Sequence, residues 1–249
     1  MNMNPESLRC EEGSLVAFFH INACEKGFNI AKQELSILES SGLWDKISFL
    51  AVGIDGKEQE ECDKMLSVYN RKIYVVGRTE GMKFEYPTLS ALQVFSQNNP
   101  KVRVCYFHTK GTRPYQGPTF ILQANWRRMA LHFMMERHMD CLELLERYVA
   151  VGVNLKWNGA VPLHFAGNFW WAWTDHLATL YDFGKIAWAI QTRFFNEYWV
   201  CSRDMGRICS IHNSNIDHYR QYYPEERYMN EENAEYVLKD GKVVNVKEG

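Results

Sequence analysis

The sequence lacks several patterns that identify common protein classes. No apolar run reaches the roughly 18 residues that a membrane-spanning helix needs, and no block of Lys and Arg marks a nucleic-acid groove. The polar start of the chain has none of the apolar character of a secretory signal peptide. With a formal net charge of −2, the composition predicts a chain with no transmembrane segment and no nucleic-acid partner.

Paired cysteines are missing as well. The seven cysteines are scattered along the 249 residues, and no two of them form a Cys-x-x-Cys pair. Zinc sites and redox motifs depend on such pairs, so neither is indicated. An odd number of scattered thiols is typical of a reducing compartment, where many of them pack as small apolar residues. The sequence therefore predicts a cytoplasmic location.

Two glycine-rich nucleotide motifs do not occur. No Gly-x-Gly-x-x-Gly follows the first expected strand, and the chain has no Gly-x-x-x-x-Gly-Lys-(Ser/Thr). Dinucleotide-dependent oxidoreductases and P-loop enzymes hold phosphates with those loops. A Rossmann-type oxidoreductase is therefore a weak hypothesis for this chain.

The first half of the sequence contains a regular alternation of apolar runs and amphipathic stretches. Strands are expected at residues 15–19, 47–52, 72–76 and 101–107, with helices at 25–42, 58–69 and 85–97 between them. Apolar strands separated by helices are typical of a mainly parallel sheet. The predicted fold class is α/β, with a mainly parallel central sheet flanked by helices and residues 101–107 as a central strand.

The second half is less regular. Its longest helical pattern covers residues 125–148, a strand is expected at 149–155, and residues 111–118 are interpreted as a surface loop. Near the end of the chain, Asp240-Gly241 lies between β-forming residues and predicts a hairpin turn.

No linker divides the chain, so we expect one domain over residues 1–249. It would comprise two halves and a C-terminal tail, at residues 15–110, 111–224 and 225–249.

The apolar run at residues 101–107 stops abruptly at His108, Thr109, Lys110 and Gly111. In open α/β sheets, ligands bind at the carboxyl edge where such strands end. These residues supply an imidazole, a hydroxyl, an ammonium, and a glycine that lets the backbone turn close to a ligand. The alternative interpretation is a surface turn with a solvated lysine.

A second unusual stretch, PLHFAGNFWWA at residues 162–172, combines a histidine, a Gly-Asn pair and three consecutive aromatic residues. Aromatic planes beside an amide suit a sugar ring, whose C–H face stacks while its hydroxyls form hydrogen bonds. The candidate acceptor-side and sugar-binding residues are therefore His164, Gly167, Asn168, Trp170 and Trp171. The alternative is an aromatic core strand whose two tryptophans point to opposite faces.

Together, these segments resemble a family of glycosyltransferases found in microbes and large viruses. The resemblance rests on YFHTKG (106–111), NWRRMALHFMMER (125–137), PLHFAGNFWWA (162–172), FFNEYWV (194–200) and IHNSNIDHY (211–219), and EYPTL (85–89) also fits. It covers residues 15–224 and implies a GT-A-like nucleotide-diphospho-sugar transferase fold, with the nucleotide sugar bound by the first half and the acceptor by the second. The implied activity is transfer of a sugar from a nucleotide-sugar donor to a glycan, glycoconjugate or other hydroxyl acceptor.

The sequence departs from the GT-A pattern where these enzymes usually carry Asp-x-Asp. Those carboxylates hold a divalent cation, Mn²⁺ or Mg²⁺, that neutralises the donor diphosphate, and no Asp-x-Asp occurs in this chain. Lys110, with His108 and His212, is therefore the expected source of positive charge at the leaving group. A divalent cofactor stays open with no ligands assigned, and so does a catalytically inactive scaffold that binds sugars or nucleotides.

Glu197 is the expected general base. An inverting transferase needs one carboxylate to take the proton of the acceptor hydroxyl, and the aromatic residues around Glu197 predict that it is buried. The alternative is a solvated glutamate on an amphipathic segment, and Asp175 is a second, weaker candidate for the base.

The remaining candidates are assigned to donor binding by their position in a GT-A-like fold. A late histidine returns to the diphosphate in several GT-A families, which points to His212 and Asn213, although this segment could also be a polar loop. The other residues of this donor-binding group are Asp55, Thr88, Thr109 and Gly111.

Overall fold

The computed structural model describes residues 2–69, 72–81, 83–112, 118–183, 185, 194–232 and 234–247. Its first half alternates strands and helices: β1 (Leu15–Ala23), α1 (Glu25–Ser40), α2 (Leu43–Lys46), β2 (Leu50–Gly56), α3 (Gln59–Leu66), β3 (Ile73–Thr79), α4 (Tyr86–Asn98) and β4 (Arg103–His108). Hydrogen bonds join β1 to β2, β2 to β3 and β1 to β4, each pair in parallel. The parallel sheet that the sequence predicts for this half is confirmed.

The second half contains shorter strands. Its elements are α5 (Pro118–Leu131), the π-helical turn η2 (His132–Glu136), α6 (His138–Leu145), β5 (Ala150–Val153), β6 (Leu155–Lys156), β7 (His164–Phe165), β8 (Trp170–Trp173), α7 (Thr174–Thr179), α9 (Phe194–Tyr198), β9 (Ile208–His212), β10 (Tyr236–Lys239) and β11 (Lys242–Asn245). Short 3₁₀ turns add η1 (Pro5–Ser7), η3 (Met205–Arg207) and η4 (Glu225–Arg227). Most of the surface loop expected at residues 111–118 lies outside the described residues.

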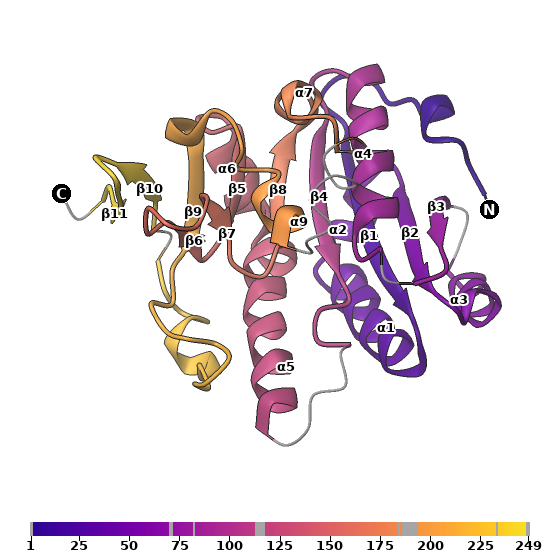
Figure 1. The fold of residues 1–249 in the computed structure, drawn as a ribbon, viewed down its shortest axis with the longest axis horizontal. Coiled ribbons are helices and arrows are strands. Elements are labelled where there is room, and N and C mark those ends of the chain that lie inside the picture. Colours follow the sequence, from indigo (N-terminus) through magenta and orange to yellow (C-terminus); the bar gives the residue numbers. More distant parts are fainter. Residues whose placement is uncertain are drawn as a thin grey trace.

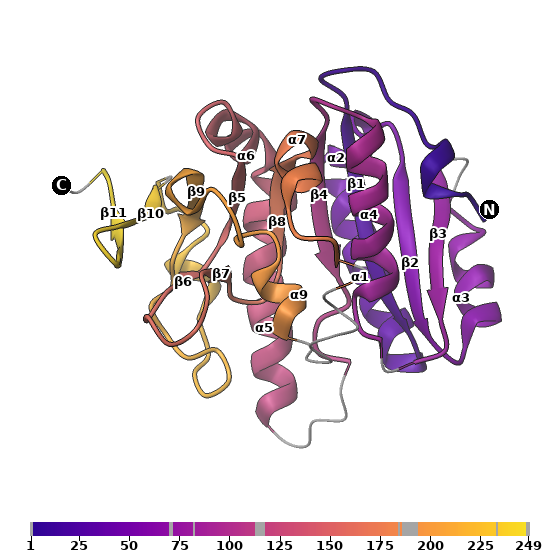
Figure 2. The same cartoon turned by 45° about the horizontal axis from the view of Figure 1, so that its top comes forward.

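One mixed sheet combines strands from both halves (Figures 1 and 2). Its spatial order is β11-β10-β9-β5-β8-β4-β1-β2-β3, so β4 lies in the interior of the sheet. β8 is antiparallel to both of its neighbours, β4 and β5, whereas β5 and β9 are parallel. The two ends of the chain lie at opposite edges of this sheet, and the halves expected from the sequence share it.

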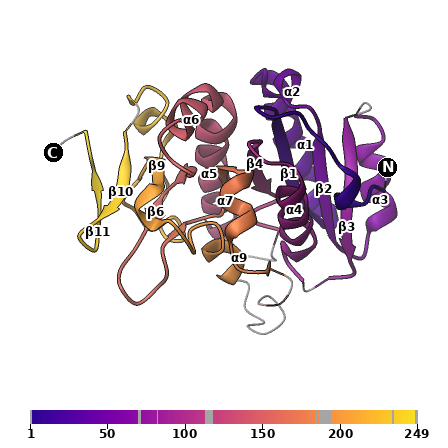
Figure 3. The ribbon, with the colours of Figure 1, turned by 90° about the horizontal axis from the view of Figure 1, so that it is seen from above.

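Helices cover both faces of the sheet. Figure 3 shows α1, α5 and α6 on one face and α4, α7 and α9 on the other. Alternate residues of β1 point to opposite faces of the sheet. Phe19 packs in the core on the side of α1, and Phe18 packs in the core on the side of α4. The Phe19 ring stacks on Phe107, with centroids 4.3 Å apart. Burying one such side chain stabilises the fold by about 1.5–3 kcal/mol.

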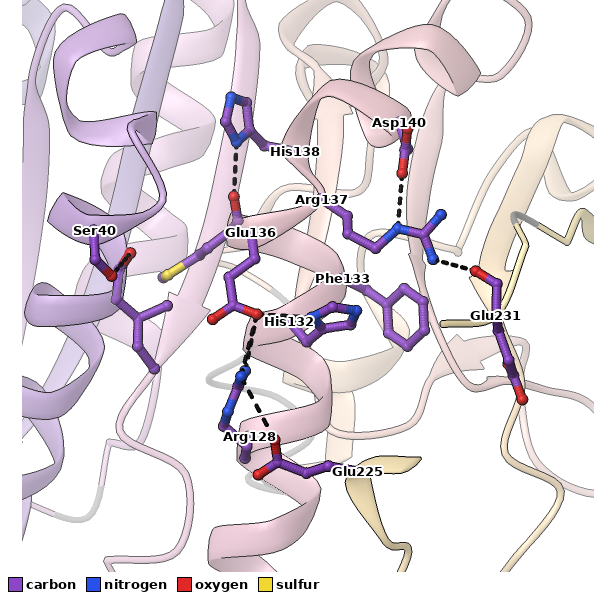
Figure 4. A network of polar contacts seen from close by, with 12 residues as sticks. Ser40, Arg128, His132, Phe133, Glu136, Arg137, His138, Asp140, Glu225 and Glu231 are labelled. Carbon is purple, nitrogen blue, oxygen red and sulfur yellow. Dashed lines mark hydrogen bonds and ion pairs between the residues drawn. The ribbon is translucent and has the colours of Figure 1, made fainter. Parts of the chain in front are cut away.

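A π-helical turn interrupts the long helical pattern of the second half. The Arg137 amide donates to the carbonyl of His132, five residues back. In Figure 4, His132 and Arg128 both contact one carboxylate oxygen of Glu136. The Arg137 guanidinium reaches across to the backbone oxygen of Glu231 over 2.9 Å. The turn therefore anchors the C-terminal segment against the end of α5.

The strand β9 differs from the sequence-based interpretation, which allowed a polar loop there. Every residue of β9 is buried, between β5 on one side and β10 on the other. Its polar residues Ser210 and His212 are covered by segments far away in the sequence, which a local pattern does not reveal.

The C-terminal hairpin forms where the sequence predicts its turn. Asp240 and Gly241 have φ angles of 50° and 73°, as a type I′ turn requires, and they connect antiparallel β10 and β11.

No helix in the described ranges is both long enough and apolar enough to cross a membrane.

Candidate functional site

A pocket opens at the carboxyl ends of the parallel strands. The chain runs outward from β1 to β2 and β3, then returns to place β4 on the other side of β1. Such a reversal is a topological switch point, where open α/β sheets bind ligands. The pocket is lined by His20, Asn22, Asp55, Phe84, Glu85, His108, Thr109, Lys110, Gly111, Thr112, Gln123, Glu197 and Tyr219. It therefore contains the strand end that the sequence singles out.

Lys110 is held in place at the end of β4. Its ammonium lies 3.9 Å from the ring centroid of Trp126, within cation–π range. Its backbone oxygen accepts a 2.6 Å hydrogen bond from the buried guanidinium of Arg127. Only 8% of Lys110 is exposed, so its charge is fixed at the pocket wall rather than free in solvent.

Two neighbouring residues shape the turn around Lys110. The Thr109 hydroxyl accepts a hydrogen bond from the backbone amide of Asn22 and so joins the end of β4 to β1. Gly111 has a φ of +95°, which disfavours other residues, and an added Cβ would lie 3.4 Å from Arg127. Both residues line the pocket, and Thr109 also has a structural role.

The two pocket histidines are neutral at physiological pH. Burial lowers the pKa of His20 and of His108 to about 4 each, and for His108 the Lys110 charge adds to this effect. His20 Nδ1 lies 2.9 Å from the Thr88 hydroxyl. His108 therefore does not supply the positive charge that its position suggests, because its imidazole has been removed from water.

His108 connects the two segments that stand out in the sequence. Its Nε2 lies 2.8 Å from the carbonyl oxygen of Gly167, and its ring packs 5.0 Å from that of Phe169. The strand end at β4 and the turn before β8 are thus direct neighbours.

Two glutamates face the pocket. Glu197, on α9, is half-buried, less enclosed than its aromatic neighbours predict. Glu85, which directly precedes α4, has one carboxylate oxygen 2.7 Å from the amide nitrogen of Asn196 and the other 3.6 Å from His108 Nδ1. Sequence reasoning missed Glu85 as a site residue, although its position before a helix with Pro87 in the first turn was a signal.

Asp55 lines the pocket and Thr88 lies next to it, and both hold other site residues in place. The Asp55 carboxylate accepts hydrogen bonds from the Thr79 hydroxyl and from the backbone amides of Gly81, Lys83 and Phe84. It thereby holds the turn that leads to Glu85. Thr88 is fully buried and contacts His20, so it positions that histidine and does not itself line the pocket.

His212 and Asn213 lie outside the pocket, contrary to their expected contact with the donor. Asn213 forms hydrogen bonds with both the amide and the carbonyl of Leu155 and so anchors β6. His212 stacks on Phe133 with centroids 4.6 Å apart, and its Nδ1 lies 2.8 Å from a Glu231 oxygen. Because β9 is an interior strand, the side chains at its end pack against neighbouring segments and do not reach the pocket.

The tryptophans expected to stack on a sugar are core residues. Trp170 and Trp171 are both fully buried, and they belong to the cores on opposite faces of the sheet. Trp170 stacks on Tyr106 at 4.9 Å, and the Trp171 indole donates to the Met134 carbonyl. Since β8 lies inside the sheet and helices cover both faces, neither ring is accessible to a ligand.

The other three residues of this segment do not line the pocket either. Asn168 is buried and accepts a hydrogen bond from the Trp170 indole. His164 Nδ1 lies 2.8 Å from the Pro162 carbonyl. Gly167 has a φ of +102° and packs so closely on Trp126 that an added Cβ would lie 3.2 Å from the indole. It contributes through its carbonyl contact with His108.

Gln123 is a further pocket residue, and no sequence pattern singles it out. It is 3% exposed, and its amide nitrogen has no hydrogen-bond partner among the described residues. A buried amide in this state is a candidate contact for a ligand atom that accepts hydrogen bonds.

The residues at the strand end do not fit a divalent cation. Lys110 contributes an ammonium there instead of a carboxylate, and both oxygens of Asp55 already accept hydrogen bonds. Elsewhere in the described ranges, no three His, Cys, Asp or Glu side chains come close enough to hold a metal ion. The charge of a bound anion at this site would be met by Lys110.

Comparisons with known proteins identify a family. Among curated proteins, none matches this chain. Among solved structures, it is similar to 4-diphosphocytidyl-2C-methyl-D-erythritol synthase from Anaerococcus prevotii, with 12% sequence identity, a TM-score of 0.43, and coverage of 87% of this chain and 94% of that one. A family model described as a domain of unknown function, DUF8361, matches residues 20–232, a range that includes the whole pocket. The chain therefore belongs to the DUF8361 family.

Proposed function

We propose that this chain is a glycosyltransferase that moves a sugar from a nucleotide-sugar donor to the hydroxyl of a glycan or glycoconjugate. The observation that carries the proposal is the pocket at the switch point of the parallel sheet, with Lys110 and two glutamates on its wall. The resemblance of its strand end and aromatic segment to a GT-A-type glycosyltransferase family supports the same assignment.

The residues divide into two chemical roles. The fixed ammonium of Lys110 would neutralise charge that develops on the departing nucleoside diphosphate. The Glu197 carboxylate would accept the proton of the attacking hydroxyl. Gly111 would let the backbone beside Lys110 approach the phosphates. No step of this scheme requires a metal ion.

A second candidate is a scaffold that binds the donor without turnover. It is favoured by the absence of a metal-fitting carboxylate pair at the strand end and by the low pKa of His108. Among the described residues that line the pocket, both features leave Lys110 as the source of positive charge at the leaving group.

Turnover measurements separate the two candidates. The purified chain is incubated with UDP-, GDP-, dTDP- and CMP-sugars, and release of the nucleotide is measured with and without sugar acceptors. We expect release by the wild type and a loss of about 10²-fold or more in Glu197→Gln. Glu146→Gln, which alters an exposed glutamate directly after α6, serves as the matched control. Binding without release would favour the scaffold, and an unaffected Glu197→Gln would assign the proton transfer to another group.

A further inference from the structure

Two hydrogen-bond acceptors face each other at the pocket wall. His108 Nε2 lies 2.8 Å from the Gly167 carbonyl oxygen, and because a carbonyl only accepts, Nε2 must carry the hydrogen. A neutral imidazole has a single N–H, so Nδ1 presents a lone pair. This lone pair lies 3.6 Å from Oε1 of Glu85, which also only accepts when ionised. Among the residues that the structure describes, the pair therefore lacks a group that donates hydrogen bonds to these two atoms.

Both acceptors are fixed in these positions. The Asn196 amide donates to Glu85 Oε2 over 2.7 Å, which leaves Oε1 directed at His108. Glu85 directly precedes α4, a helix of 13 residues, whose N-terminal partial charge favours a carboxylate there. The side chains of His108 and Glu85 are only 12% and 13% exposed. Neither can turn away without breaking its other hydrogen bond.

The surroundings favour a neutral donor over a cationic one. The charge of Lys110 acts directly on His108 and lowers its pKa, so a second positive group at this place would be repelled. Gln123 lines the same pocket and has a buried amide nitrogen with no acceptor among the described residues. Hydroxyl groups both donate and accept hydrogen bonds, so a ligand with several of them suits a pocket wall with two acceptors and an unpaired amide.

We infer that Glu85 and His108 form a hydroxyl-binding subsite that accepts hydrogen bonds from adjacent hydroxyls of the donor sugar. The assignment to the donor rests on the proposed function. Lys110, two residues after His108, is placed at the diphosphate, so the sugar joined to that diphosphate lies beside His108. Adjacent hydroxyls supply one hydrogen each to Nδ1 and Oε1. Glu85 is thus a specificity-determining residue for a hydroxylated ligand.

Glu85→Gln tests the inference because the new amide completes the pair internally. Its oxygen can accept from Asn196 while its NH₂ donates to His108 Nδ1, which closes the subsite without a change in shape. We expect an unchanged or higher melting temperature. We also expect at least tenfold weaker binding of the nucleotide sugar that the wild type binds best among UDP-glucose, UDP-galactose and GDP-mannose. Binding of the matching nucleoside diphosphate, which has no sugar, should not change, and Glu146→Gln serves as the control.

A measurement on the wild type does not depend on the folding of any variant. The ¹H–¹⁵N NMR spectrum of the histidine side chains at pH 7 should show His108 with its proton on Nε2 and none on Nδ1. A proton on Nδ1 would mean that His108 and Glu85 form an ion pair, and this NMR result overturns the inference. In that case Glu85→Gln would also lower the melting temperature. Equal affinity of wild type and Glu85→Gln for the nucleotide sugar also overturns it, and leaves the proposed function intact.

The proposed function can fail separately. If the wild type binds none of the three nucleotide sugars and none of the nucleoside diphosphates, the donor assignment is wrong. The subsite is then tested by adding free glucose and recording the NMR signals of His108. Shifts in the wild type but not in Glu85→Gln support the subsite. The absence of shifts in the wild type overturns it.

Discussion

Arg127 Nη1 lies 2.6 Å from the backbone oxygen of Lys110 and donates a hydrogen bond to it. The same guanidinium has its Nε 3.8 Å from a carboxylate oxygen of Glu34 on α1. Glu34 is fully buried, and burial raises its pKa well above the usual range. Neither of its oxygens has a hydrogen-bond partner in the part of the chain that the structure describes. The buried residues Arg127 and Glu34 therefore hold the backbone at Lys110 in place.

Arg127→Met should destabilise the fold by about 1–3 kcal/mol, because it leaves the buried backbone oxygen of Lys110 without its donor and removes the positive charge beside the Glu34 carboxyl. The double variant Arg127→Met/Glu34→Leu should recover part of this loss, since it also removes a buried carboxyl whose oxygens have no hydrogen-bond partner among the described residues. Urea unfolding of the wild type, the two single variants and the double variant forms a complete cycle. Additive losses in the cycle would show that the two residues do not interact.

His20 should make the fold sensitive to acid. Burial lowers its folded pKa from 6.5 to about 4, so the folded state binds this proton less readily than the unfolded chain. The stabilisation is complete above about pH 6.5 and is lost as the pH falls towards 4, with a limit of about 3 kcal/mol.

His20→Gln retains an amide that can contact Thr88 but cannot titrate. Its free energy of unfolding should fall less steeply than that of the wild type between pH 7 and pH 4. A slope remains, because His108 titrates in the same window. Urea unfolding at several pH values measures both slopes, and identical slopes would exclude His20 as a contributor.

The sequence is sufficient to predict the parallel half of the sheet and the place of the pocket. Apolar strands separated by helices have few alternatives to a parallel arrangement, and the abrupt end of residues 101–107 marks the carboxyl edge that forms part of the pocket wall. Both signals are local, so they can be read without knowledge of distant segments.

The roles of the aromatic segment and of His212 depend on long-range pairing. Trp170 and Trp171 are buried because β8 inserts between β4 and β5. His212 is buried outside the pocket because β10 pairs with β9 and covers it. Glu85 reaches the pocket only because Asp55 holds the preceding turn. Nothing in the spacing of these residues along the chain encodes such contacts.

Gly111→Ala should disturb the pocket more than a substitution at a comparable glycine. Gly111 and Gly159 have φ angles of +95° and +79°, so an alanine at either position is strained by about 1–2 kcal/mol. Only at Gly111 does the added Cβ meet neighbours, 3.2 Å from Gln123 and 3.4 Å from Arg127. We expect similar or greater loss of stability in Gly111→Ala and a loss of ligand binding in that variant alone. Normal binding by Gly111→Ala would show that the turn around Lys110 adapts to the added methyl group.

Lys110 is the residue on which the proposed chemistry depends most. Its ammonium is fixed over Trp126 at the pocket wall, and the neighbouring histidines are neutral because burial lowers their pKa values to about 4. Lys110→Met keeps much of the apolar stem and removes the charge, so the rate at saturating donor should fall by about 10²-fold or more. Lys32→Met, at an exposed position on α1, should leave the rate unchanged. Initial rates are compared with and without EDTA, and we expect the wild type to retain most of its activity when divalent ions are removed. Complete loss of activity on chelation, together with wild-type rates in Lys110→Met, would assign the leaving-group charge to a metal ion held by other residues.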